Sequence, residues 1–228
     1  MEYKNLVLIG TSHIARQSIA EVKYAIENYN PSVVALELDA KRLPALLQKE
    51  KRGISWRDIR RVGVKGFLFA LLGQWAEQKL GEIVKVSPGS EMKTAYKLAM
   101  QKNIKVALID QDIEVTLKNL SKRMSWKEKW NFIVDILKAV ILRKKEVEFD
   151  LTKVPEKKVI DKMIGEVKKR YPNIHKVLIG DRNKIMARRL YRIMGKEEGK
   201  IVAIVGAGHE EEIIGLIKGL EKRKADIF

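Results

Sequence analysis

A chain of 228 residues suits one globular domain with room for a sizeable insertion. It contains no cysteine, which excludes disulfides and cysteine-based zinc sites. The net charge of +17 permits binding to nucleic acid, anionic lipid or an acidic partner. Aromatic residues are few and do not alternate with the basic ones, which argues against nucleic-acid binding and favours a solvated lysine-rich surface.

The composition also predicts where the protein acts. No apolar run reaches the roughly 18 to 20 residues that a membrane-spanning helix needs, and the first residues read as a strand rather than a signal peptide. We therefore expect a cytoplasmic protein, with the short apolar segment 66–73 as a site for peripheral membrane contact. The charged fraction of 33%, rich in Lys and Glu, is typical of a thermophile.

Apolar runs and helical patterns alternate along the chain. The run 5–9, a helical pattern to Tyr29 and the run 32–38 form a β-α-β unit. Further apolar runs, each taken as a strand, follow at 104–109, 176–179 and 201–205. This order predicts an α/β fold with a mainly parallel central sheet of about five or more strands flanked by helices.

Two helical insertions interrupt this alternation. The first, at about 50–84, is basic at its start and apolar in its second half. The second, at about 116–172, is strongly basic and places Trp126 and Trp130 on one helix face. Either a buried position in the core or a subunit contact would explain such apolar faces, and a subunit contact would make the chain a homodimer through the helical insertion.

The sequence Gly-x-x-His occurs twice, each time directly after an apolar run. His13 follows the first strand and His209 follows the last, and together they are two of the three histidines. His175 lacks this frame and is expected to be an ordinary structural or surface histidine. Because the carboxyl ends of parallel strands share one edge of a sheet, we expect the fold to bring the two Gly-x-x-His turns together.

Carboxylates and an arginine are predicted at the same edge. Glu37 ends an apolar strand, where a carboxylate is costly unless it is bound to a metal or paired with a Lys or Arg. Glu91 lies in the first turn of a helix, where either the helix dipole or a role in the site explains it. Arg182 could hold a substrate carboxylate or an oxyanion. The remaining acidic residues expected at this edge are Asp110, Asp112 and Asp181.

This set of side chains suits a divalent transition metal. Two neutral imidazoles, from His13 and His209, and a carboxylate such as Glu37 would bind Zn, Mn, Fe or Co. Such an ion polarises a carbonyl and lowers the pKa of bound water, and a spare carboxylate could act as general base. The glycine-rich turns could instead bind an anion, although no complete phosphate- or dinucleotide-binding motif is present.

Six sequence blocks in order resemble the TraB/PrgY family, which is related to the TIKI metalloproteases and more distantly to ChaN-like and erythromycin-esterase-like folds. The blocks are Gly10-Thr-Ser-His-Ile14, Leu36-Glu-Leu38 with Arg42 downstream, Pro88-Gly-Ser-Glu-Met92, Leu108-Ile-Asp-Gln-Asp-Ile113, Asp181-Arg182 with Met186-Ala-x-Arg-Leu190, and Gly206-Ala-Gly-His209. The resemblance spans nearly the whole chain and implies a single TraB-like α/β domain over residues 1–228.

The resemblance also implies which residues act. His13, His209 and Glu37 would bind the metal, and Glu37, Glu91 and Arg182 would be catalytic. The family block around Arg182 usually has Asp where this chain has Asn183. The implied activity is that of a metal-dependent hydrolase, a peptidase by analogy with the TIKI relatives, acting on a peptide or small-molecule substrate. The alternative is a non-catalytic peptide- or ligand-binding regulatory protein of the pheromone-shutdown type.

Overall fold

The computed structural model describes residues 1–11, 16–47, 89–142 and 157–225. Within these ranges the strands are β1 (Glu2–Tyr3), β2 (Leu6–Thr11), β3 (Val33–Leu36), β4 (Lys105–Leu108) and β5 (Ile201–Gly206). They form one sheet in the order β1-β2-β5-β3-β4, in which every neighbouring pair except β1 and β2 is parallel. The predicted α/β class with a mainly parallel sheet is confirmed.

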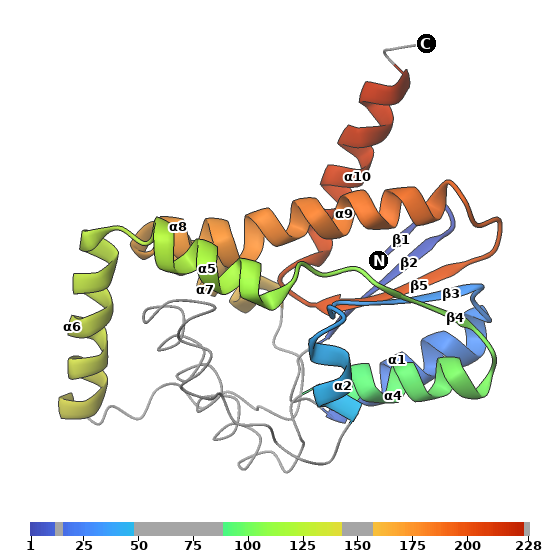
Figure 1. The fold of residues 1–228 in the computed structure, drawn as a ribbon, viewed down its shortest axis with the longest axis horizontal. Helices are drawn as coiled ribbons and strands as arrows, with labels where there is room; N and C mark the ends of the chain where they lie inside the picture. The colour runs from blue at the N-terminus through green and yellow to red at the C-terminus, as the bar shows by residue number, and fades with distance from the viewer. Residues whose placement is uncertain (12–15, 48–88, 143–156, 226–228) are drawn as a thin grey trace.

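Helices cover both faces of this sheet (Figure 1). Helices α1 and α4 pack on one face, and α9 and α10 pack on the other. The helices are α1 (Arg16–Tyr29), α2 (Arg42–Leu47), α4 (Ser90–Gln101), α5 (Ile113–Arg123), α6 (Trp126–Leu142), α7 (Lys157–Arg170), α8 (Pro172–His175), the π-helix η2 (Lys176–Gly180), α9 (Asp181–Met194) and α10 (Glu210–Ala225). The result is three layers, with the sheet between two layers of helices.

Strand residues alternate between two apolar cores. In β5, Val202 and Ile204 pack toward α1 and α4, whereas Ala203 and Val205 pack toward α9 and α10. Successive side chains of a strand point to opposite faces, so a strand covered on both sides must be apolar at every position. This explains why the strands of the central sheet read as unbroken apolar runs.

The first and last strands of the parallel sheet are direct neighbours. Their register runs from Leu6 opposite Ile201 to Thr11 opposite Gly206. Beyond the register, the Ala207 N–H donates to the Thr11 carbonyl at 2.9 Å. The fold therefore brings together the strand ends that precede the two Gly-x-x-His turns, as predicted. His13 itself lies outside the described residues.

The predicted strand at 176–179 is wrong, because these residues form η2 between α8 and α9. A four-residue apolar run is compatible with either a buried strand or a helix, since periodicity cannot separate them at that length. The tertiary contacts decide the matter. Val177 is buried against Leu120, Met124 and Ile174 from the neighbouring helices rather than against the sheet.

The second predicted insertion contains helices α5, α6 and α7. Trp126 and Trp130 on α6 are 82% and 68% exposed, so they do not belong to the core of this chain. The Lys129 ammonium lies 4.4 Å from the centre of the Trp126 ring. The first insertion at 50–84 and the apolar segment 66–73 lie outside the described residues, and the division of the chain into one domain with two insertions stays a prediction.

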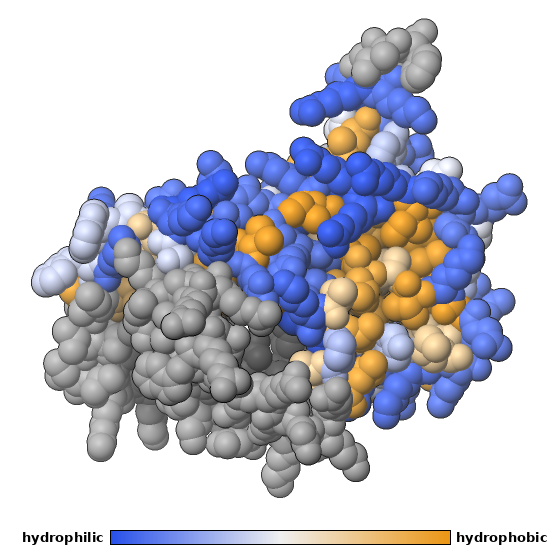
Figure 2. All heavy atoms as spheres, viewed as in Figure 1, coloured by the Kyte–Doolittle hydropathy of each residue, from blue (hydrophilic) through white to orange (hydrophobic). Residues whose placement is uncertain are grey.

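The visible surface is polar on its helices and apolar along one edge. Figure 2 shows hydrophilic residues over the outer side of α9 and apolar residues between α9 and α4, beside β4. Partly buried hydrophobic residues of this region include Ile104, Val106 and Leu108. Across the described ranges, no helix is both long and apolar enough to cross a bilayer.

The central position of β5 leads to a stability prediction. Ile204→Ala should lower the free energy of unfolding by about 2–5 kcal/mol, because the fully buried side chain would leave a cavity. Met100→Ala, at an exposed position of α4, should change it by about 0.5 kcal/mol or less. Urea unfolding followed by circular dichroism measures both values. Equal effects of the two substitutions would contradict this placement of β5.

Candidate functional site

The polar residues predicted at the strand ends gather at the carboxyl edge of the sheet. Glu37 directly follows β3, Asp110 follows β4, and His209 lies in the turn between β5 and α10. All three side chains are buried, although each carries a polar or charged group. The parallel strand order makes this possible, because β5 lies between β2 and β3 and all of these strands end on the same side.

Glu37 links β3 to β5 and α9. One carboxylate oxygen, Oε2, accepts a hydrogen bond of 2.6 Å from the Gly206 N–H. The other, Oε1, accepts a hydrogen bond from Arg182 Nη2 and lies 3.4 Å from His209 Nε2. With 5% exposure, the carboxylate avoids the cost of burial through these partners. The pairing of Glu37 with an arginine, one of the two explanations expected for it, is therefore present.

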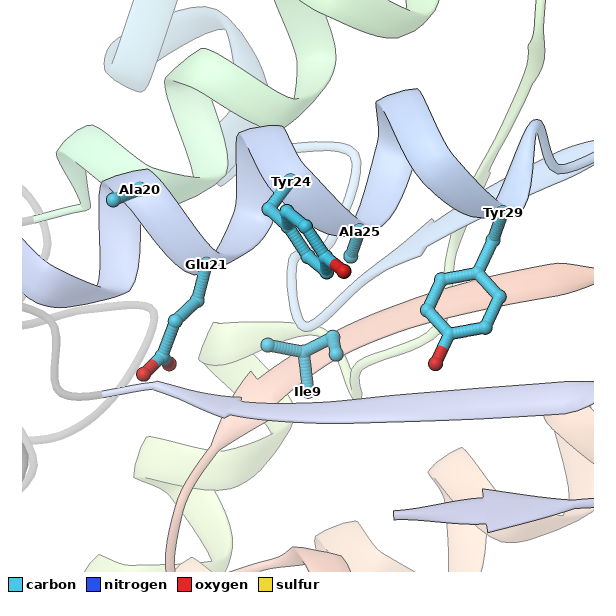
Figure 3. Close-up of a pocket in the computed structure, with 6 residues that line it drawn as sticks. All are labelled: Ile9, Ala20, Glu21, Tyr24, Ala25 and Tyr29. Atoms are coloured by element: carbon cyan, nitrogen blue, oxygen red, sulfur yellow. The ribbon is translucent and has the colours of Figure 1, made fainter.

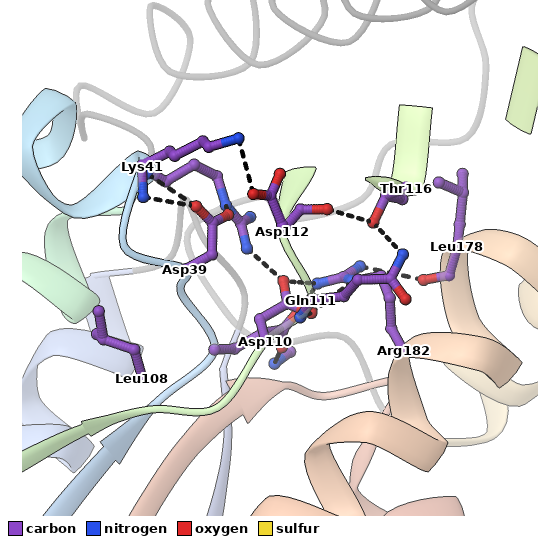
Figure 4. Close-up of polar contacts among 12 residues, drawn as sticks. Asp39, Lys41, Leu108, Asp110, Gln111, Asp112, Thr116, Leu178 and Arg182 are labelled. Atoms are coloured by element: carbon purple, nitrogen blue, oxygen red, sulfur yellow. Dashed lines mark hydrogen bonds and ion pairs between the residues drawn. The ribbon is translucent and has the colours of Figure 1, made fainter. Parts of the chain in front are cut away.

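Arg182 joins Glu37 to Asp110. Its Nε donates to Asp110 Oδ1 at 2.9 Å and its Nη2 donates to Asp110 Oδ2 at 2.8 Å, which is the bidentate geometry that suits a guanidinium and a carboxylate (Figure 4). Its Nη1 donates to the Leu178 carbonyl at 3.0 Å, within the π-helical turn. Because most of the guanidinium N–H groups bind protein acceptors, at most a small part of it remains for a substrate.

A second arginine completes the network around Asp110. Arg42, at the start of α2, donates from Nη2 to Asp110 Oδ2 and from Nε to Asp39 Oδ2 at 2.6 Å. Asp39 Oδ1 also accepts the backbone N–H of Lys41 at 2.8 Å, which fixes the turn between β3 and α2 (Figure 4). Asp110 therefore lies between two guanidinium groups, one from each side of the sheet edge.

These two arginines determine the ionisation of Asp110. Burial raises the pKa of a carboxyl group, but the hydrogen bonds and positive charges of Arg182 and Arg42 outweigh it and hold the pKa of Asp110 below its usual value. The same carboxylates favour the charged form of Arg182 and raise the pKa of its guanidinium despite burial. Asp110 and Arg182 are therefore both ionised at neutral pH.

His209 is held from the side opposite Glu37. Asn183, in the first turn of α9, places its Oδ1 2.6 Å from His209 Nδ1. The amide nitrogen of Asn183 donates to Glu212 Oε2 at 2.8 Å, in the first turn of α10. His209 thus lies between Asn183 and Glu37, with one ring nitrogen toward each. This arrangement connects the histidine of the second Gly-x-x-His turn to Glu37, which the sequence predicted, and to Asn183, which it did not.

Other predicted residues occupy nearby positions with structural partners. Glu91 is buried in the first turn of α4, whose N-terminus lies at the carboxyl edge because the helix runs antiparallel to the strands. Asp112 caps α5 by accepting the Glu114 N–H and forms an ion pair with Lys41 at 2.8 Å. Asp181 forms an ion pair with Arg123 at 2.6 Å. Asp112 and Asp181 are therefore engaged in structural contacts outside the Glu37 network.

A cavity of about 470 Å³ lies beside His209, at the ends of β2 and β5. Carboxylates of α7 and α10 line it together with the glycines of both turns. Glu210 covers Gly10, where a Cβ atom would overlap with the carboxylate in its present position, so glycine lets the Glu210 side chain lie against the backbone. Burial raises the pKa of Glu210, and the chain amino group 3.8 Å away opposes this shift.

A second cavity of about 390 Å³ lies between α1 and β2. Ile9 points from β2 toward the helix, and Glu21, Tyr24 and Tyr29 line the opposite side (Figure 3). Its lining contains none of the residues of the Glu37 network. We therefore place the candidate site at the strand ends rather than in this cavity.

The described residues supply part of a metal site. His209 Nε2 and Glu37 Oε1 are a nitrogen and an oxygen ligand of the type that Zn, Mn, Fe and Co accept. In the part of the chain that the structure describes, no group of three or more His, Asp or Glu side chains is placed to hold a metal ion. His13, the predicted third ligand, lies outside the described residues, so the complete predicted set is not visible.

Three residues of the network had not been given a role by the sequence. Asp39 and Arg42 follow Glu37 closely, and their signal was a charged pair directly after an apolar strand. Asn183 follows Arg182 in the sequence, and its only signal is a departure from a family pattern. Arg42 and Asn183 contact Asp110 and His209, which the sequence does identify, and Asp39 holds Arg42. The contacts of Arg42 and Asn183 join distant segments and leave no local pattern.

Removing the central guanidinium should destabilise the fold. Arg182→Ala leaves Glu37 and Asp110 buried without their shared partner, which should cost about 3–5 kcal/mol in the free energy of unfolding. Arg188→Ala, at an exposed position of the same helix, should cost about 0.5 kcal/mol or less. Chemical denaturation measures the difference. A loss below 1 kcal/mol for Arg182→Ala, taken as roughly the value of an exposed pair, would contradict a buried network.

The lowered pKa of Asp110 predicts the direction of an acid effect. Because its pKa is lower in the folded chain than in the unfolded one, its contribution is fully present above roughly pH 4 and is lost as pH falls through the folded-state value. Asp110→Asn should therefore lose less unfolding free energy than the wild type between neutral and acidic pH. Parallel losses in the two proteins, measured by denaturant titration at each pH, would contradict this assignment.

Comparison with known proteins places the chain in a family. The profile of the TraB/PrgY/gumN family matches residues 2–227. An uncharacterized protein of Methanocaldococcus jannaschii is 34% identical over 225 residues, covering 95% of this chain and 54% of that protein. TraB domain-containing proteins of Bos taurus and Homo sapiens are 26% and 25% identical over 240 residues, covering 94% of this chain and 61% of each relative.

These matches agree with the arrangement of the residues. The family match covers β2, β3, β4, β5 and α9, which together carry Glu37, Arg182 and His209. The chain spans only about half to three-fifths of the length of these relatives, so the match concerns this domain. The fold, the order of the motifs and the extent of the match lead to one conclusion: the chain belongs to the TraB/PrgY/gumN family.

Proposed function

We propose that this chain carries a metal-dependent hydrolase site that cleaves peptide bonds. The observation that carries the proposal is the distance of 3.4 Å between His209 Nε2 and Glu37 Oε1, at the junction of β5 and β3. Metal–nitrogen and metal–oxygen bonds to these groups are about 2.0–2.2 Å long, so two ligands of one ion stand roughly 3–3.5 Å apart. The spacing of the pair suits a shared ion.

The electrostatics of the pair support the same proposal. The Glu37 carboxyl group is buried, and a neutral imidazole presents a lone pair on its unprotonated nitrogen. Two lone pairs that face each other repel, and a cation bound between them would remove this repulsion. Arg182 Nη2 donates to the same oxygen, Oε1, and satisfies part of its acceptor capacity. His13, two residues after the end of β2 in the sequence, is the proposed third ligand.

The ion would be Mn, Co, Fe or Zn, and when bound it would supply a Lewis acid and a water molecule of lowered pKa. The residues of the chain then have separate tasks. Arg182 and the Gly206 N–H hold the Glu37 carboxylate in one orientation. Glu91, buried at the same edge, is the proposed general base. The role proposed for Arg182 is therefore mainly to position Glu37, with little capacity left to bind an oxyanion directly.

The acidic cavity beside His209 is the proposed approach for the substrate. Glu211 and Glu212 contribute to its lining together with Asp161 from α7, which gives the entrance a negative potential. A positively charged peptide segment would be favoured there over an acidic one. The preference for basic over acidic peptides therefore tests the proposed peptidase function independently of the metal.

A non-catalytic ligand-binding protein is the second candidate. The observation in its favour is that Glu37, Asp110, Arg182 and Arg42 pair with one another, as charges in a purely structural network do. Such a protein would bind a peptide in the same cavity without turning it over. Binding without cleavage, in the presence of each candidate metal, would favour this second function.

Metal content tests the proposal directly. Protein purified without oxygen or chelators should contain stoichiometric transition metal by mass spectrometry, and His209→Ala and Glu37→Gln should each lose it because each removes a proposed ligand. His175→Ala is the matched control, since His175 ends α8 and is not a proposed ligand. It should keep the metal.

Turnover is the second measurement. The metal-loaded wild type should cleave basic quenched-fluorescence peptides faster than acidic ones, and His209→Ala should fall to background. A wild-type protein that binds no metal after reconstitution with Mn, Co, Fe or Zn would overturn the metal-dependent function. Metal binding without cleavage of any peptide would leave the regulatory candidate as the conclusion.

A further inference from the structure

We propose that Glu212 and Asn183 form a relay that holds His209 in one tautomer, with the proton on Nδ1 and the Nε2 lone pair facing Glu37. Asn183 is then a positioning residue, and Glu212 positions Asn183. The relay rests on the proposed function in one respect only, which is that the Nε2 lone pair serves to bind a metal ion. Its existence can be tested in the metal-free protein.

Three elements bring the members of the relay together. Asn183 lies in the first turn of α9 and is 0% exposed. His209 lies in the turn before α10, and Glu212 lies in the first turn of that helix. Because α9 and α10 pack side by side on the same face of the sheet, the amide of Asn183 lies between the imidazole and the carboxylate.

Glu212 determines which way the amide points. An ionised carboxylate can only accept hydrogen bonds, so it selects the NH₂ group of Asn183 over the carbonyl group. The carbonyl oxygen must then face His209. In general the two ends of an amide are told apart by their hydrogen-bonding partners, and here Glu212 provides an unambiguous one.

The amide in turn determines the tautomer of His209. Its Oδ1 is an acceptor 2.6 Å from His209 Nδ1, so Nδ1 must be the donor. A neutral imidazole carries one proton, and the other nitrogen is then an acceptor. Nε2 therefore presents its lone pair toward Glu37 Oε1, 3.4 Å away. Each step follows from the donor and acceptor capacity of the preceding group.

An amide suits position 183 better than a carboxylate does. Aspartate there would place a second negative charge at hydrogen-bonding distance from Glu212, and both groups would be acceptors. Asparagine provides a donor on one side and an acceptor on the other. Its NH₂ group can therefore donate to Glu212 while its carbonyl oxygen accepts from the imidazole, and no charge is added to a buried position.

A fixed tautomer matters for a metal-binding histidine. Removing a group that orients a metal ligand in this way typically lowers the metal affinity by about 10–100-fold. Glu212 is exposed, so changing it should affect the relay without disturbing the core. This exposure makes it the better position for a test than Asn183, whose replacement could unfold the chain.

The decisive variant is Glu212→Lys. Its ammonium group can only donate, so Asn183 should turn its carbonyl toward the lysine and its NH₂ group toward His209 Nδ1. The proton of His209 should then move to Nε2. Glu212→Ala, which removes the acceptor without adding a donor, should give a mixture of tautomers. Ring ¹⁵N chemical shifts of the metal-free protein, recorded at alkaline pH and assigned with His→Gln variants, distinguish the two forms.

The matched control is Glu27→Lys, which makes the same charge change at an exposed position of α1 that lines neither cavity. It should keep the Nδ1–H tautomer and the metal affinity of the wild type. Glu212→Lys should raise the metal Kd by about 10–100-fold relative to Glu27→Lys. Circular dichroism and urea unfolding of each variant establish that the fold is intact.

The outcomes separate the relay from the proposed function. An unchanged wild-type tautomer in both Glu212→Lys and Glu212→Ala, or a doubly protonated His209 in the wild type at alkaline pH, would overturn the relay even if metal binds. The predicted tautomer changes in a protein that takes up no metal would support the relay and overturn the metal-dependent function. Tautomer change together with a raised Kd would support both.

Discussion

The arrangement of this domain depends on the burial of Glu37 at the end of β3. A carboxylate in an apolar environment is costly unless opposite charges and donors surround it. Here the N–H of Gly206 and the guanidinium of Arg182 provide them, from β5 and α9 respectively. Satisfying one buried charge thus requires three elements that are distant in sequence to meet at one point. The same requirement extends through Arg182 to Asp110 after β4 and to Arg42 on α2.

The residues of the network both stabilise the fold and orient the candidate site. The two arginines keep Asp110 ionised and hold the turns after β3 and β4, while Glu37 keeps one oxygen near His209. A site built in this way is rigid, because each charged side chain is held by more than one partner. Rigidity of the supporting groups is what a metal-binding or catalytic pair needs, since small displacements of a ligand have large effects on affinity and rate.

The strand order places the two strands that lead into the Gly-x-x-His sequences side by side. β5 inserts between β2 and β3, so the last strand of the chain pairs with the first strand of the parallel sheet. Glycine at position 10 allows Glu210 to lie directly over the backbone. The π-helical turn before α9 contributes the Leu178 carbonyl that holds Arg182. π-Helical turns often occur at functional positions, and this one orients the central guanidinium of the network.

The sequence by itself determined the fold class, the edge of the sheet that carries the polar residues and the identity of Glu37, Arg182 and His209 as members of one cluster. Unbroken apolar runs and strand-end residues are local patterns, so they can be read without a structure. Only the tertiary structure decided that 176–179 is helical, that Trp126 is exposed, and that Arg42, Asp39 and Asn183 join the cluster. Those outcomes depend on which distant side chains supply donors, acceptors and apolar neighbours, and a linear pattern does not contain that information.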